Sequence, residues 1–90
     1  MNKELAEITA IQAVAFLAGD ENYMSWLMNE TGLSVADFSS LTDNLDILAG
    51  VLDFLLMHEK ILLEFCEAQN IDPTVPARIR PFFPGSTLEY

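Results

Sequence analysis

The sequence is organised by apolar side chains that recur every three or four residues, between residues that typically begin or end helices. Leu5, Ile8 and Ile11 have this spacing in the first segment, and Asp20 is a favourable N-cap for the second. Gly32 is suited to end the second helix, because glycine adopts a left-handed backbone conformation without steric cost. No segment shows the sustained alternation of a β-strand, so the pattern predicts an all-α fold.

The rest of the chain is divided by signals of the same kind. We expect a short segment and three further helices, bounded by Ser34 to Leu41, Asp43 to about Met57, His58 to Asn70, and Asp72 to about Arg80. Prolines and a glycine beyond Arg80 prevent the last helix from continuing. The sequence therefore predicts one compact domain of five to six helices over residues 1–80, followed by a mobile C-terminal tail over residues 81–90.

The two halves of the chain align without a gap at an offset of 38 residues, which places Phe16 over Phe54. Helix-ending residues also align at this offset, with Gly32 over Asn70. Sequence identity is low, so a chance alignment of generic helices is one explanation. We favour the other, a duplicated helix–helix–short-helix unit over 5–41 and 43–80, because matching caps are less generic than matching leucines.

The charge of the chain limits its partners, since 14 acidic residues stand against 4 basic ones and give a formal net charge of −10. Such a chain has few cations for phosphate groups and is repelled by anionic lipids, so we expect neither nucleic-acid nor membrane binding. The longest apolar run, from Ile47 to Met57, contains Asp53 and is too short to span a bilayer. A single cysteine and an N-terminus unlike a signal peptide favour the cytoplasm.

Several short motifs are shared with a known family: Asp53 to Leu56, then Glu59, Phe65-Cys66 and Asp72-Pro73. With these residues the chain resembles a small alphaproteobacterial family catalogued as domain of unknown function 3572. Earlier residues, Ala15 to Ala18 and Gly32-Leu33, fit the same pattern, so the resemblance covers most of 5–85. His58 departs from the acidic residue of the pattern. Membership implies a bacterial cytosolic protein and no particular activity, because these are packing and capping residues.

No combination of residues indicates catalysis, a cofactor or a metal site. His58 is the only histidine and Cys66 the only cysteine, eight residues apart in sequence. One histidine is poor material for a metal site, and Cys66 lies between Glu64 and Glu67, which disfavour a thiolate. We therefore predict that the protein is not an enzyme and holds no cofactor.

Two features near the C-terminal end leave alternatives open. Asp53 interrupts an apolar helix, so it is either exposed or paired with a cation, for which Lys60, Arg78 and Arg80 are available. Phe82 and Phe83 follow the two arginines, so they either form a contact site with them or fold back to seal the bundle.

The predicted function is a small protein-interaction module. The helix from Asp43 has little polar surface, so it is either central in the bundle or buried against another chain. We expect a homo-oligomer, with a dimer favoured, and an interaction surface drawn from Ile47, Val51, Phe54, Arg78, Arg80, Phe82 and Phe83. The alternative is an acidic adaptor, or a mimic of nucleic acid, that binds a basic protein surface.

Overall fold

The computed structural model describes residues 2–34, 36–38 and 44–85. Its elements are helical: α1 (Lys3–Ala18), α2 (Glu21–Thr31), α3 (Leu45–Met57), α4 (Glu59–Gln69), α5 (Val75–Ile79) and the 3-10 helix η2 (Arg80–Phe82). A further 3-10 turn covers residues 36–38. These described residues contain no strand, and the predicted all-α bundle is confirmed.

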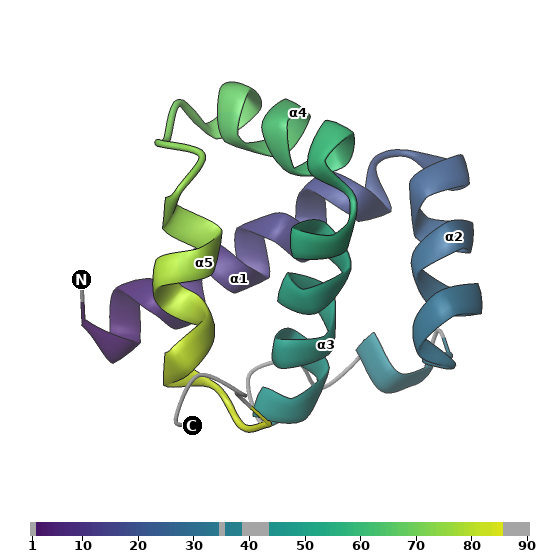
Figure 1. Ribbon diagram of the computed structural model, residues 1–90. Coiled ribbons are helices and arrows are strands. Elements are labelled where there is room, and N and C mark those ends of the chain that lie inside the picture. Colours follow the sequence, from purple (N-terminus) through teal and green to yellow (C-terminus); the bar gives the residue numbers. More distant parts are fainter. Residues whose placement is uncertain (1, 35, 39–43, 86–90) are drawn as a thin grey trace.

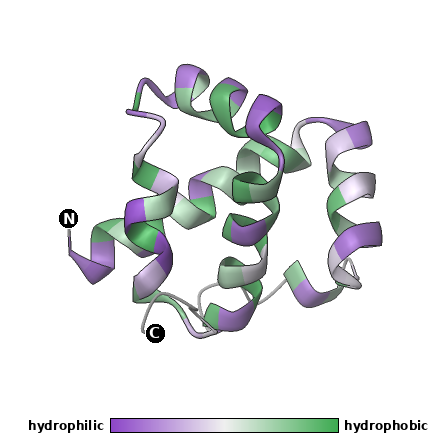
Figure 2. Cartoon of the chain, viewed as in Figure 1, coloured by the Kyte–Doolittle hydropathy of each residue, from purple (hydrophilic) through white to green (hydrophobic). Residues whose placement is uncertain are grey.

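Helix α3 is the centre of the bundle and contacts all the other helices. In Figure 1, α1 passes behind α3, α2 and α5 flank it on opposite sides, and α4 crosses one end. Figure 2 shows that α3 is hydrophobic over most of its length, whereas α2 is mostly hydrophilic. The apolar character of α3 is thus explained by neighbours within the same chain.

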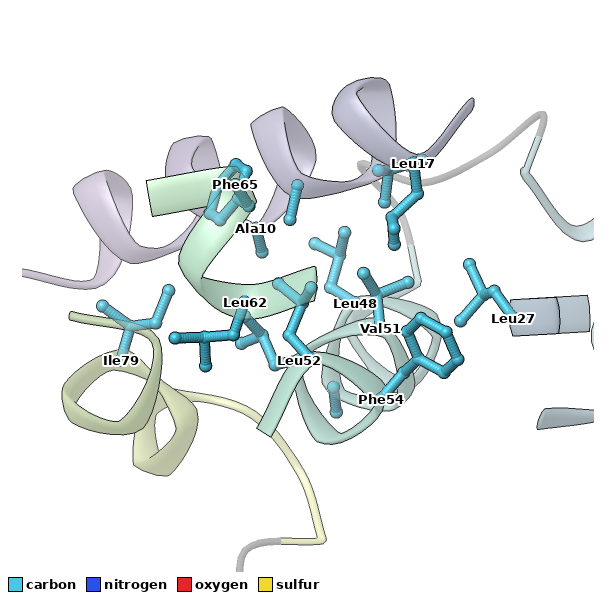
Figure 3. Close-up of a cluster of buried hydrophobic side chains, with 14 of the residues drawn as sticks. Ala10, Leu17, Leu27, Leu48, Val51, Leu52, Phe54, Leu62, Phe65 and Ile79 are labelled. Atoms are coloured by element: carbon cyan, nitrogen blue, oxygen red, sulfur yellow. The ribbon is translucent and has the colours of Figure 1, made fainter. Parts of the chain in front are cut away.

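The core forms where α1 and α4 pack against α3. Three alanines of α1 are fully buried: Ala6, Ala10 and Ala13. Their small side chains let the backbones of α1 and α3 approach closely. Side chains of α3 leave the helix in several directions, and Figure 3 shows Phe54 near Leu27 and Leu52 near Leu62. This arrangement makes α3 the hydrophobic axis of the domain.

The helix ends follow the predicted capping signals in most places. Asp20 accepts hydrogen bonds from the backbone N–H groups of Asn22 and Tyr23, at 2.9 and 3.1 Å. Gly32 and Asn70 take left-handed conformations, with φ of 75° and 57°, at the ends of α2 and α4. The Asp20 side chain thus fixes the start of α2, and the left-handed residues fix the ends of α2 and α4.

Two predicted helix starts need correction. Asn44 is the N-cap of α3 and accepts from the amides of Asp46 and Ile47, whereas the predicted cap, Asp43, lies outside the described residues. Asp72 caps a turn instead of a helix, since its Oδ1 accepts from the amide and hydroxyl of Thr74. Helix α5 begins only at Val75, after this turn.

The helix boundaries bear on the predicted duplication. Helices α2 and α4 both have 11 residues and coincide at the offset of 38, as do their left-handed caps. At this offset the C-terminal ends of α1 and α3 also nearly coincide, but the two helices differ in length, with 16 and 13 residues. The duplication stays a prediction, and the match between α2 and α4 is the structural feature consistent with it.

The folded domain extends past the predicted boundary at residue 80. Phe83 is only 3% exposed and belongs to the core, and Arg80 is buried beside it. The segment after α5 is therefore part of the domain, because a buried aromatic ring anchors it. Residues 86–90 of the predicted tail lie outside the described residues.

Candidate functional site

Three residues of the predicted interaction surface face the core. Ile47, Val51 and Phe54 are all buried on α3, between helices of the same chain. They are not accessible to a partner of the folded protein, which corrects this part of the predicted surface. Of the two alternatives for this helix, the structure shows the central position in the bundle.

Asp53 forms an ion pair with Arg80, one of the two alternatives left open by the sequence. The Nε and Nη2 atoms of Arg80 donate to Oδ1 and Oδ2 of Asp53 at 2.6 and 3.1 Å. The Nη1 atom of Arg80 donates to the carbonyl oxygen of Phe83 at 3.2 Å. The planar guanidinium thus joins α3 to the last turn of the domain through a bidentate contact.

The basic and aromatic residues near the C-terminal end divide into two pairs. Arg80 and Phe83 are buried, so Phe83 seals the bundle as one alternative predicted. Arg78 and Phe82 are exposed and remain accessible to a partner. Only two of the four residues of this predicted contact site are therefore accessible to a partner.

The described residues form a cleft of about 330 Å³ between α2 and α3. Its lining combines apolar and acidic groups: Glu30, Thr31, Gly50, Asp53, Phe54 and Met57. Met57 is 73% exposed at its edge, the highest exposure among the large apolar side chains of the described residues. The cleft thus offers apolar contact area beside two carboxylates from different helices.

An aromatic cluster holds one carboxylate of the cleft in place. The Trp26 and His58 rings have centroids 4.3 Å apart, and His58 lies 4.7 Å from the Phe54 ring. His58 Nε2 lies 2.6 Å from Glu30 Oε2, which links the α3–α4 junction to α2. Sequence reasoning missed this cluster, because no spacing rule connects Trp26 to a histidine 32 residues away.

Gly50 leaves the floor of the cleft open. It lies in the interior of α3, where glycine costs up to about 1 kcal/mol relative to alanine. A Cβ atom built at Gly50 would meet no atom within 4 Å, so packing does not require a glycine there. The missing side chain instead adds to the space between α2 and α3.

A second hollow lies along α4 alone, lined by Lys60, Leu63, Glu64, Glu67 and Ala68. One of its two acidic side chains is already engaged, since Tyr23 donates to Glu64 at 2.5 Å and Lys60 lies 3.5 Å from the same carboxylate. The hydrogen bond to Glu64 raises the pKa of Tyr23 above its ordinary value. A ligand in this hollow would touch a single helix.

Cys66 is buried in the core, and this desolvation raises the pKa of its thiol above the ordinary value. A thiol of this kind is a poor nucleophile, because the reactive species is the thiolate. Within residues 2–34, 36–38 and 44–85, no group of three or more His, Cys, Asp or Glu side chains is placed to hold a metal ion. Nor does this part of the chain include a helix with the length and apolarity needed to cross a membrane.

The comparisons with known proteins give a family. A family model described as a protein of unknown function (DUF3572) matches residues 3–86. The chain belongs to the DUF3572 family. The resemblance seen in the sequence is thereby confirmed, and the match extends past Phe83, in keeping with the buried position of that residue. No curated protein and no solved structure matches the chain.

Proposed function

We propose that this DUF3572 protein is a non-catalytic, cytoplasmic binding module that recognises a basic segment of a partner protein. The observation that carries the proposal is the cleft between α2 and α3, where Glu30 and Asp53 stand beside the exposed apolar side chain of Met57. Combined acidic and apolar linings suit basic side chains, which have long apolar stems and charged heads.

The charge of the whole chain supports the same choice of partner. A net charge of −10 attracts cationic segments over a distance set by the salt concentration and disfavours acidic ones. Two of the exposed apolar side chains, Trp26 and Met57, are of types that are enriched in protein interfaces. Long-range attraction and short-range apolar contact would therefore act on the same partner.

Isothermal titration calorimetry with an acetylated hexa-arginine peptide tests the proposal. We expect binding at about 20 mM NaCl that weakens at least tenfold by about 300 mM, because salt screens the attraction between exposed charges. An acetylated hexa-glutamate peptide is the matched control and should not bind. Absence of hexa-arginine binding at the lower salt concentration would contradict the proposal.

Self-association is a second candidate, favoured by an exposed apolar face on α1. Leu5 and Ile8 are exposed one turn apart on this helix, and Phe82 is exposed on η2, which contacts α1. Two chains of charge −10 repel each other, so a dimer should strengthen as salt is added, the opposite of binding to a basic partner. Sedimentation velocity at low and high salt distinguishes the two, and replacing Leu5 and Ile8 by glutamine should abolish a dimer formed through this face.

A further inference from the structure

We infer that the cleft between α2 and α3 holds the side chain of one arginine from the basic segment. This inference depends on the proposed function and names the pocket that would give it specificity. A volume of about 330 Å³ lies at the lower end of the range for ligand sites, which suits one long side chain better than a larger ligand.

The floor and edge of the cleft fit the stem of an arginine. Met57 offers exposed apolar surface, and Gly50 contributes no side chain that would fill the space above α3. An alkyl stem would bury against this surface while its head stays near solvent. The exposed Trp26 ring packs edge-on against Phe54, with centroids 5.8 Å apart, so an exposed aromatic surface lies next to the cleft.

The two carboxylates at the cleft fit the head of an arginine. Glu30 comes from α2 and Asp53 from α3, and each is held by a residue of its own chain, His58 and Arg80 respectively. An ionised carboxylate has about four acceptor sites, so each retains capacity for an incoming N–H group. Because both carboxylates are already positioned, binding would lose little side-chain entropy on the protein side.

Arginine suits this arrangement better than lysine. Its guanidinium is planar and carries five N–H donors, so one head can donate to more than one carboxylate oxygen. It is also more weakly hydrated than an ammonium group and stacks on aromatic rings. A lysine would contribute the charge without the planar head, and would bind through general attraction.

The test compares cleft variants with a matched surface variant in titrations with acetylated hexa-arginine and hexa-lysine peptides. Gly50→Leu fills the cleft from its floor, and Glu30→Gln removes one carboxylate while keeping a side chain of the same shape. Glu67→Gln, exposed on α4 and away from the cleft, changes the net charge by the same amount as Glu30→Gln. Circular dichroism and thermal unfolding check that each variant is folded, and Glu30→Gln serves if Gly50→Leu is not.

We expect Glu30→Gln to weaken hexa-arginine binding about tenfold, the effect of losing one charge-assisted hydrogen bond. Gly50→Leu should weaken it at least as much, Glu67→Gln less than twofold, and the wild-type protein should bind hexa-lysine several-fold more weakly than hexa-arginine. If the cleft variants bind like Glu67→Gln, the arginine pocket is refuted while the proposed function stands. If the wild-type protein binds neither peptide at low salt, both are refuted.

Discussion

Replacing Asp53 by alanine should destabilise the domain by about 2 kcal/mol. The substitution removes two hydrogen bonds to a charged group, each worth about 1.5–3 kcal/mol. It leaves the Arg80 guanidinium buried, with the Phe83 carbonyl as its remaining partner among the described residues. The Arg80 side chain is 8% exposed, but that of Asp53 is 51% exposed, so water can replace part of the lost contact. We therefore place the expected loss below the sum of the two bonds, at about 2 kcal/mol.

Thermal unfolding followed by circular dichroism measures this loss. For a domain of this size, about 2 kcal/mol corresponds to a decrease in Tm of roughly 10 °C. Glu67→Ala removes an equal charge from an exposed position on α4 and is the control, for which we expect a change of less than about 2 °C. The reasoning would be refuted if Asp53→Ala behaved like this control.

A double-mutant cycle identifies the cause of the loss. Arg80→Met removes the buried charge that Asp53→Ala leaves unpaired, so the two effects should not add. We expect a coupling free energy of at least about 1 kcal/mol in chemical unfolding. Additive effects would show that Asp53 stabilises the domain in some way other than through Arg80.

Three further predictions follow from the core and from α3. Gly50→Ala should raise the free energy of unfolding by about 0.5–1 kcal/mol in urea titrations, because the new Cβ meets no atom and alanine favours the helix; a loss would contradict the open cleft floor. Phe83→Ala should lower it by about 3 kcal/mol and Phe82→Ala by less than about 1 kcal/mol, and equal effects would be inconsistent with Phe83 as the ring that seals the bundle. The Cys66 thiol, with its raised pKa, should react with Ellman's reagent at pH 8 only as fast as the protein unfolds, whereas rapid labelling of the native protein would show an accessible thiol.

Local signals predicted most of the fold because they act between near neighbours in the chain. Asp20 and Gly32 delimit α2 as expected, since a carboxylate that accepts from backbone amides and a glycine with positive φ need only adjacent residues. Asp72-Pro73 misled the prediction of α5, because the side-chain bonds to Thr74 satisfy a turn as well as they would a helix start.

Features formed between distant residues could be predicted only in part. The candidates for pairing with Asp53 included Arg80, but choosing among three cations required the geometry of the C-terminal turn. The contact of Trp26 with His58 joins two segments that no sequence pattern relates. Apolarity of α3 showed that the helix is buried, but whether its neighbours come from the same chain depends on how the other helices pack around it.

The most direct test of the account is amide chemical-shift mapping by NMR of the labelled protein titrated with acetylated hexa-arginine at low salt. We expect the largest shift changes on both sides of the α2–α3 cleft, at Glu30, Thr31, Gly50 and Asp53. Changes centred on the hollow of α4, spread evenly over the acidic residues, or missing at saturating peptide would contradict it.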